Sequence, residues 1–253
     1  MDPDPVRQYG DALAVVTVTR RGLPGLDGLR AALPAATARA VHLVVVDTGS
    51  GSTATDGDVL RLAEDVGRAA AVNRAVAALE PSVGWVVLTD PGVRWRPGAI
   101  DLLCAAAARQ PRAGLLGPRL HTAGDAAGAG GPLPGVLAAA RGRIAGPVGA
   151  GPTGWLSTAA ALVRRAAWDS VDGFDGRYLG GPGGIGDVDL GDRLGRAGWL
   201  VVAVPGAGAD TEPGDTFEDG HGILEPHAAG LDRYVRDRAS GPVRALAALA
   251  RRR

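Results

Sequence analysis

The sequence contains no lysine, one cysteine and no long hydrophobic run. Every basic side chain is therefore an arginine, which together with 40 glycines points to a genomic base bias more than to a function. Acidic and basic residues balance at 27 each, so bulk charge gives no support to a nucleic-acid partner. The single Cys104 excludes an internal disulfide and any cysteine-based zinc site.

Membrane-crossing and export signals are also missing. No apolar stretch approaches the roughly 20 residues needed to span a bilayer. The N-terminal decapeptide MDPDPVRQYG lacks the basic and apolar regions of a signal peptide. We therefore expect a cytoplasmic protein, one that can rest peripherally on the inner face of the cell membrane.

The chain is rich in short apolar runs that alternate with helical patterns. Its 253 residues, 46% of them hydrophobic, suit one large α/β domain with a sizeable core. Strand-like runs occupy 12–19, 41–47, 59–63, 84–90 and 113–120, and helical patterns occupy 25–33, 67–79 and 96–108. Buried strands separated by helices predict a Rossmann-like, mostly parallel central sheet with helices on both faces.

The second half of the chain continues the pattern after a break. The Gly-, Ala- and Pro-rich range 122–153 is interpreted as a loop or linker. Beyond it we expect a strand leading into a helix at 158–168, a glycine-rich loop at 172–186, a helix at 187–199 and a strand at 199–207.

Two carboxylates end neighbouring predicted strands. Asp47 closes VHLVVVD, and Asp90 closes GWVVLTD. Because carboxyl ends of parallel strands meet at one edge of a sheet, where α/β proteins bind nucleotides, we expect both acids at a ligand crevice. Asp47 could instead form an Asx-turn with the TGSGST that follows it, and Asp90 in Asp-Pro-Gly could be a turn residue.

Two more acids open the predicted helix at 187–199. Asp187 and Asp189 fit an N-cap and first-turn acid, and a helix N-terminus also keeps a carboxylate ionised, as a general base requires. Arg193 could bind a phosphate or pair with Asp189 one turn back. Asn73 lies within a helix, where it either bonds a neighbouring strand or faces the crevice.

Several motifs, in this order, resemble those of a family 2 glycosyltransferase with the GT-A fold. They read VVTVT, VVVDTGSGST, GRAAAVNRAV, VVLTDPGVRWRPGAIDLL, RAGLLGPRL, GWLSTAAALVRR, VDGFDGRY and GDVDLGDRLGRAGWL. The likeness runs from about residue 12 to about residue 241 and is most specific at GWLSTAAALVRR and DVDLGDRLGRAGWL. It is greatest to actinobacterial rhamnosyltransferases of cell-wall linker synthesis. Those enzymes transfer rhamnose from dTDP-rhamnose to an N-acetylglucosaminyl-diphospho-polyprenol.

The resemblance implies a single GT-A domain with roles for particular residues. Residues 12–120 would form the nucleotide-sugar half, 154–207 the acceptor and catalytic half, and 208–253 a helical tail. Asp187 would be the general base of an inverting hexosyl transfer. Implied nucleotide-sugar contacts are Thr17, Asp47, Asn73, Asp90 and Arg193. Implied acceptor contacts are Trp155, Ser157 and Asp189.

The sequence departs from the family pattern around the metal and the base. The second acid of the Asp-x-Asp-type motif is Gly92, and the Glu that usually precedes the base is Gly186. The region after the last strand, where the family usually has a His, reads GADTE (208–212). Mg²⁺ or Mn²⁺ would then bind Asp90 only together with the donor diphosphate, with Asp210 or Glu212 as a second oxygen ligand. In a metal-independent reaction, Arg193 would offset the leaving-group charge.

These departures leave two readings of function open. The first is a glycosyltransferase that moves a deoxysugar, rhamnose by resemblance, from a nucleotide donor to a lipid-linked or glycan acceptor in cell-envelope synthesis. The second is a catalytically degenerate GT-A protein that binds a nucleotide sugar or a partner enzyme. The tail VRALAALARRR (243–253) could contact an anionic membrane or be a solvated helix end.

Overall fold

The structure is a computed structural model that describes residues 9–19, 26–48, 58–122, 125–127, 130–135, 139, 149–178, 185–211 and 228–238. The first half contains β1 (Ala12–Thr19), α1 (Leu26–Ala36), β2 (Val41–Thr48), β3 (Asp58–Leu62), α2 (Arg68–Ala78), β4 (Val83–Thr89), β5 (Val93–Trp95), α3 (Ala99–Arg109) and β6 (Ala113–Thr122). The second half contains β7 (Asp125–Ala127), β8 (Gly130–Gly131), β9 (Gly151–Thr153), β10 (Trp155–Leu156), β11 (Ala160–Arg164), α5 (Arg165–Asp169), α6 (Ile185–Arg196), β12 (Leu200–Thr211) and α7 (Ala228–Arg238).

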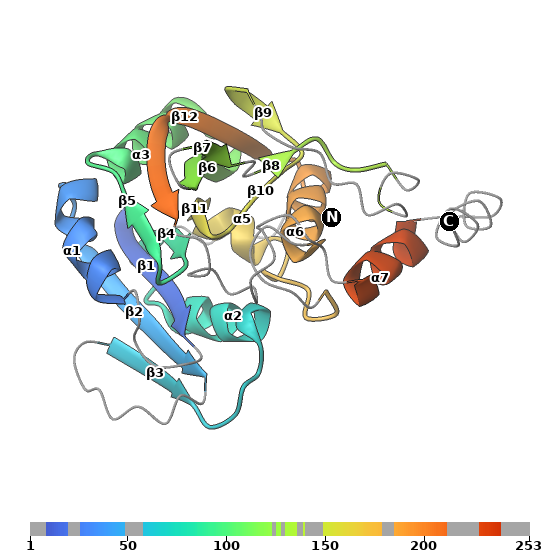
Figure 1. The fold of residues 1–253 in the computed structure, drawn as a ribbon, viewed down its shortest axis with the longest axis horizontal. Helices are drawn as coiled ribbons and strands as arrows, with labels where there is room; N and C mark the ends of the chain where they lie inside the picture. Colours follow the sequence, from blue (N-terminus) through green and yellow to red (C-terminus); the bar gives the residue numbers. More distant parts are fainter. Residues whose placement is uncertain are drawn as a thin grey trace.

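A ten-stranded sheet of described residues forms the centre of the molecule (Figure 1). Its main path runs β3-β2-β1-β4-β11-β6-β12-β5, with β7 paired to β6 and β9 to β12. The strands β3, β2, β1 and β4 pair in parallel, and β6 pairs in parallel with β12. β11 is antiparallel to both of its neighbours, so β4 and β6 on either side of it run in the same direction. The fold is therefore α/β with a mostly parallel sheet, as the sequence predicted.

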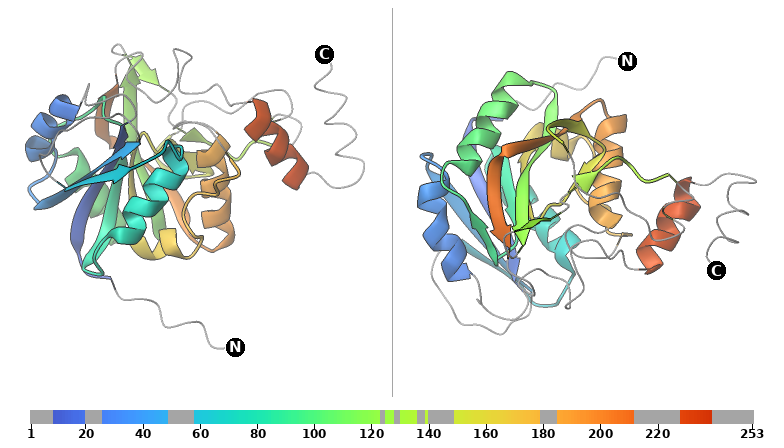
Figure 2. Two further views of the ribbon diagram at one scale, coloured as in Figure 1. Left: turned by 90° about the horizontal axis from the view of Figure 1, so that it is seen from below. Right: turned by 45° about the horizontal axis from the view of Figure 1, so that its top comes forward.

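Alternating side chains of the strands build a core on each face of this sheet. Leu13 and Val15 of β1 join the core that α1 and α3 cover. Ala14 and Val16 point to the other core, which α2, α5 and α6 cover. The views in Figures 1 and 2 show these helices on either side of the strands, with α7 lying beyond α6. The period of two along a strand thus divides the apolar residues between two helical layers.

The predicted strands and helices of the first half are confirmed, with small shifts at their ends. β1 matches the predicted range 12–19 fully, and β12 continues to Thr211, four residues beyond the predicted end. The sequence analysis did not predict β5, because its three residues are too few to show a period.

The interpretation of 122–153 as a loop or linker was wrong for part of its length. β7 extends the sheet beside β6, and β9 pairs with β12. β8 pairs with β10 in a separate two-stranded sheet. These strands are only two or three residues long and are too short to show a side-chain pattern, so backbone pairing with other segments decides them.

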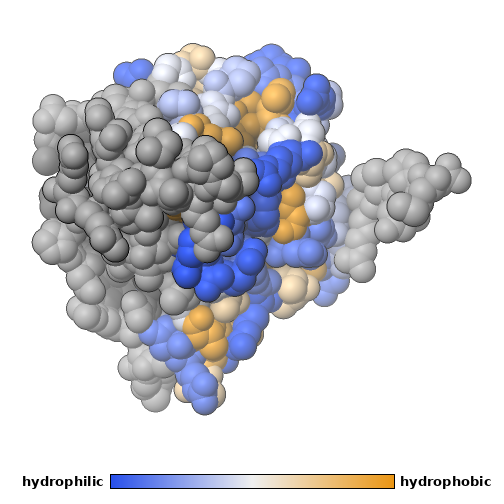
Figure 3. Space-filling model, turned by 90° about the vertical axis from the view of Figure 1, so that its right-hand side faces the viewer, coloured by the Kyte–Doolittle hydropathy of each residue, from blue (hydrophilic) through white to orange (hydrophobic). Residues whose placement is uncertain are grey.

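No helix among the described residues is long and apolar enough to cross a membrane. Figure 3 shows the face that lies at the right of Figure 1. On its described part hydrophilic side chains predominate, and hydrophobic side chains occur in separate small areas.

Helix α6 approaches the short strand β10 unusually closely. A Cβ atom at Gly191 would lie 2.4 Å from the Gly154 carbonyl oxygen and 2.9 Å from the Trp155 Cα. Both neighbours are backbone atoms, which cannot swing aside as a side chain can. Only glycine fits here, and the contact fixes the position of α6 against the GWLS segment.

We predict that Gly191→Ala lowers the free energy of unfolding by about 1–3 kcal/mol, the usual cost of overpacking. Gly195→Ala is the matched control on the same helix, because a Cβ atom there would meet nothing within 4 Å. The control should be stabilised by about 0.5–1 kcal/mol through helix propensity. Urea unfolding of the three proteins measures both effects. Equal stability of Gly191→Ala and the unmodified chain would contradict the prediction.

Candidate active site

Four segment ends meet at the carboxyl edge of the sheet. Asp90 directly follows β4, and β4 ends there. Helix α2 connects the parallel strands β3 and β4, and α6 precedes β12, which runs in the same direction. Both helices therefore begin at the carboxyl edge of the sheet. Thr158 precedes β11, which is antiparallel to β4 and so starts where β4 ends. The topology therefore collects Asp90, Arg68, Thr158 and Asp187 from segments far apart in the sequence.

Asp90 forms a buried ion pair with Arg68, the first residue of α2. The Arg68 Nε atom lies 3.3 Å from Asp90 Oδ1, and the two side chains are 6% and 1% exposed. The backbone N–H of Asp90 donates to the Ala159 carbonyl at 2.9 Å, and its carbonyl accepts from Val93 at 3.1 Å. The acid is thus held as a turn residue and as the partner of a guanidinium at the same time.

Thr158 connects this arginine to Asp187. Arg68 donates from Nη1 to the Thr158 hydroxyl at 3.0 Å and from Nη2 to the Thr158 carbonyl at 2.8 Å. The same hydroxyl donates to Asp187 Oδ1 at 2.7 Å, and the Thr158 backbone N–H donates to Oδ2 at 2.9 Å. Asp187 is buried in the first turn of α6. One continuous chain of contacts therefore joins Asp90, Arg68, Thr158 and Asp187.

Asp47 and Thr17 lie at the same edge. Asp47 is the penultimate residue of β2 and is in register with Thr19 of β1, while Thr17 is in register with Thr89. The expectation that Asp47 and Asp90 reach one edge of the sheet is thus confirmed, with β1 between them. The Thr17 hydroxyl is buried and has no hydrogen-bond partner within the described part of the chain. A hydroxyl buried in this way is available to a ligand.

Two residues expected near the donor have other partners in the structure. Both ends of the Asn73 carboxamide bond the backbone of Phe174, at 2.8 and 2.9 Å, so this side chain binds the 171–174 turn and not a neighbouring strand. Arg193 pairs with Asp189 at 2.7 Å, one turn back, and donates to the carbonyls of Val171 and Gly173. Both side chains therefore anchor the 171–174 turn, and the Arg193 Nη2 atom has no hydrogen-bond partner within the described part of the chain.

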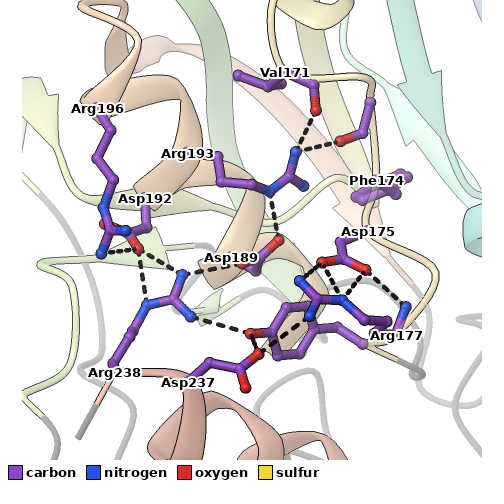
Figure 4. A network of polar contacts seen from close by, with 12 residues as sticks. Val171, Phe174, Asp175, Arg177, Asp189, Asp192, Arg193, Arg196, Asp237 and Arg238 are labelled. Atoms are coloured by element: carbon purple, nitrogen blue, oxygen red, sulfur yellow. Dashed lines mark hydrogen bonds and ion pairs between the residues drawn. The ribbon is translucent and has the colours of Figure 1, made fainter. Parts of the chain in front are cut away.

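Asp189, expected beside the acceptor, instead ties α6 to α7 (Figure 4). Its Oδ1 accepts a hydrogen bond from Arg238 of α7 at 3.0 Å, and its Oδ2 accepts one from Arg193. Arg238 also donates to Asp192 at 2.8 Å and to the Tyr178 hydroxyl at 3.1 Å. Both oxygens of the buried Asp189 are therefore occupied, and its role in the structure is to join the two helices.

The pKa values of Tyr178 and Arg238, two members of this network, follow from their burial and their contacts. Burial raises the pKa of Tyr178 to about 12, and its bond to Asp237 acts in the same direction. Burial alone would lower the pKa of Arg238, but the bonds to Asp189 and Asp192 outweigh it and leave the pKa raised. The docking of α7 therefore keeps a charged arginine and a neutral phenol throughout the neutral range.

The two other predicted acceptor residues lie next to one another in the GWLS segment. Trp155 is fully buried, and its indole N–H has no partner within the described part of the chain. The Ser157 oxygen accepts from the Ala159 N–H at 3.2 Å and so shapes the turn that delivers Thr158. Trp155 is open to an acceptor role, whereas Ser157 serves the local turn.

The residues at this edge do not fit a divalent metal ion. Asp90 is paired with Arg68, residue 92 is a glycine, and Asp210 accepts two hydrogen bonds from Arg96 at 2.6 and 2.9 Å. Arg96 also holds the pKa of Asp210 below its ordinary value. Arg96 therefore pairs with Asp210, which the sequence suggested as a second ligand, and Glu212 lies outside the described residues. Over those residues, no three His, Cys, Asp or Glu side chains gather as a metal site would require.

The sequence analysis overlooked Arg68 and Thr158. One signal could have revealed Arg68, because a cation at the first position of a helix opposes the helix dipole and α2 has no first-turn acid to offset it. Such a residue calls for a nearby counter-charge, which Asp90 supplies. Thr158 carried no comparable signal, since a threonine before a strand is unremarkable.

The solved structures that resemble this chain define its class. A crystal structure of GalNAc-T7 with UDP, GalNAc and Mn²⁺ matches 89% of this chain and 47% of its own, with a TM-score of 0.64 and 11% identity. The mannosyltransferase PcManGT of Pyrobaculum calidifontis, in complex with GDP-Man and Mn²⁺, matches 98% and 81%, with a TM-score of 0.55 and 16% identity. S. aureus TarS matches 94% and 42%, with a TM-score of 0.58 and 12% identity. The fold is the GT-A fold of glycosyltransferases.

Sequence relatives narrow the class to a family, although no protein-family model matches the chain. It is 35% identical, over 91% of its own length and 86% of theirs, to the N-acetylglucosaminyl-diphospho-decaprenol L-rhamnosyltransferases of two Mycobacterium tuberculosis strains. At that identity and coverage the chain belongs to this glycosyltransferase family.

We predict that Arg238→Met lowers the free energy of unfolding by about 1–3 kcal/mol, because Asp189 and Asp192 lose a charged donor where water has little access. Arg236→Met is the matched control, since Arg236 is exposed on the same helix. Urea unfolding gives the stabilities, and hydrogen exchange over 228–238 reports the docking of α7. Unchanged exchange in Arg238→Met would show that the network does not hold the helix.

Proposed function

We propose that this protein transfers a deoxysugar, with inversion, from a nucleotide donor to a lipid-linked acceptor in cell-envelope synthesis. The family supplies the chemical class: its mycobacterial members are named for transfer of L-rhamnose to N-acetylglucosaminyl-diphospho-decaprenol. The observation that carries the proposal is Asp187, a buried carboxylate at the crevice edge that is fixed by two hydrogen bonds from Thr158. The first donor to test is dTDP-rhamnose.

The reaction needs one proton acceptor and one leaving-group site. Asp187 takes the proton of the acceptor hydroxyl while that oxygen attacks the anomeric carbon from the face opposite the diphosphate. The bond from carbon to the diphosphate oxygen breaks, and the nucleoside diphosphate leaves with the bonding electrons. Thr158 donates one hydrogen bond to each oxygen of Asp187, and these bonds fix the carboxylate that would accept the incoming proton.

The donor would lie across the ends of β1, β2 and β4. Asp47 is placed to accept from the base or ribose, and the buried Thr17 hydroxyl lies deeper at the same edge. Asp90 and Arg68 would face the diphosphate. Trp155 would border the acceptor, because it belongs to the segment that also delivers Thr158 to Asp187.

The glycines at positions 92 and 186, where the family pattern has acids, are compatible with a second function. In that case the chain would be a GT-A protein that binds a sugar nucleotide without transferring the sugar. Retention of Asp187 in its hydrogen-bonded position favours catalysis over this alternative. A thermal-shift panel of sugar nucleotides, followed by a transfer assay with the ligands that bind, separates the two. A ligand at 100 times its dissociation constant raises stability by about 2.7 kcal/mol.

We further propose a cytoplasmic location with contact to the inner face of the cell membrane, where a polyprenyl acceptor would be anchored. The support is compositional. The arginines and the Ala/Leu face of VRALAALARRR (243–253) suit an anionic surface, and this tail lies outside the described residues.

Asp187→Asn should bind the donor normally and lose transfer activity by roughly 10²–10⁴-fold, because an amide cannot accept the proton. Asp47→Ala is the complementary variant: we expect weaker nucleotide binding with an unchanged fold. Calorimetry with dTDP-rhamnose and a product assay on each variant measure the two effects. Transfer by Asp187→Asn at the unmodified rate would remove Asp187 from the mechanism, and unchanged affinity of Asp47→Ala would leave it a turn residue.

The membrane contact is tested by flotation with vesicles that contain anionic lipid. We expect the full chain to float, and the chain that lacks residues 243–253 to float less, since polybasic segments gain about 1 kcal/mol per arginine near such a surface. Neutral vesicles serve as the control. Equal flotation of the two chains would show that the tail is no anchor.

A further inference from the structure

The donor site contains a fixed cation where a metal ion would otherwise be needed. Arg68 reaches Asp90 with Nε at 3.3 Å and reaches Thr158 with both terminal nitrogens. We propose that the Arg68 guanidinium takes the place of the divalent metal ion, binding Asp90 and supplying the positive charge that the donor diphosphate requires. This inference rests on the proposed function, since it concerns the same donor.

A metal ion and Arg68 would compete for the same carboxylate. Both side chains of the pair are almost completely buried, so solvent screens little of their charge. A divalent cation on Asp90 would lie beside the guanidinium, and two cations in such a place repel strongly. With Gly92 in place of a second acid and Asp210 paired with Arg96, the remaining carboxylate in this chain of contacts is Asp187, and Thr158 already binds both of its oxygens.

Arg68 still has donors to offer a diphosphate. The hydrogen bonds of Arg68 to Thr158 use one N–H of each terminal nitrogen, and each terminal nitrogen of a guanidinium carries a second N–H. The planar fork of arginine matches phosphate oxygens and keeps its charge at every physiological pH. Fixed donors of this kind stabilise a leaving group without having to reorganise.

The position of Arg68 also links the two halves of the reaction. Through Thr158 it is one hydrogen bond from the base Asp187, and through Nε it contacts the acid at the diphosphate. A single cation therefore lies between two buried carboxylates. Removal of Arg68 would leave Asp90 without this counter-charge and make it attractive to a metal ion.

The decisive experiment compares donor affinity in EDTA and in Mn²⁺ for four proteins. Calorimetry with dTDP-rhamnose and with dTDP should give the unmodified chain the same affinity in both solutions. Arg68→Met should bind about 10–100-fold more weakly in EDTA, the usual loss for a charged hydrogen-bonding group. Mn²⁺ should restore part of that loss. Arg68→Lys should keep part of the affinity in EDTA, because it retains the charge and loses the fork.

Arg165→Met is the matched control. Arg165 is also a buried arginine paired with an aspartate, but it belongs to α5 and bonds Asp169 at 3.0 Å. The affinity of Arg165→Met for the donor should be the same in EDTA and in Mn²⁺. Binding of Mn²⁺ without nucleotide, followed by electron paramagnetic resonance, gives an independent readout: it should be absent in the unmodified chain and present in Arg68→Met.

The outcomes separate the inference from the function on which it rests. Donor affinity of the unmodified chain that disappears in EDTA would overturn the role of Arg68 and leave the glycosyltransferase proposal standing. If Arg68→Met binds the donor in EDTA as tightly as the unmodified chain does, the role of Arg68 is likewise overturned and the glycosyltransferase proposal still stands. If the unmodified chain binds no sugar nucleotide in either solution, the proposed function fails first. If circular dichroism shows that Arg68→Met does not fold, the unmodified chain and Arg68→Lys still decide the question.

Discussion

The contact between Arg68 and Asp90 is the interaction on which the rest of the site depends. Isolated buried charges are costly, and both Asp90 and Asp187 are buried at the edge of the sheet. One guanidinium serves both, directly at Asp90 and through the Thr158 hydroxyl at Asp187. Because α2, β4, β11 and α6 all contribute to this chain of contacts, the site and the packing of these four elements are stabilised by the same groups.

Helix α6 is held from two sides so that Asp187 keeps its place. Gly191 lets the helix backbone meet the Gly154 carbonyl, which sets its distance from β10. On the other side, Asp189 and Asp192 bind Arg238 of α7. Arg193 adds the carbonyls of the 171–174 turn, and Asn73 holds the same turn from α2. If Asp187 acts as the proposed base, a helix fixed in this way would need little reorganisation when an acceptor arrives.

The charges at the carboxyl edge of the sheet are consistent with one another. Gly92 stands where the family pattern has a second acid, so this edge has one carboxylate fewer. The remaining Asp90 is already neutralised by its ion pair with Arg68. The pairing of Asp210 with Arg96 fits the same trend, because it commits another acid close to the end of β12.

The sequence by itself determined the strands, the alternation of helices and the edge at which the acids gather. Strand β1 was predicted to the residue, and Asp47 and Asp90 fell at strand ends on the same edge of the sheet, because periodicity and strand polarity are local properties. Only the tertiary structure decided which side chains serve the site. The partners of Arg68, Asn73 and Asp189 lie 90, 101 and 49 residues away along the chain. A hydrogen bond across such a separation depends on the packing of whole elements, and no spacing within one segment records it.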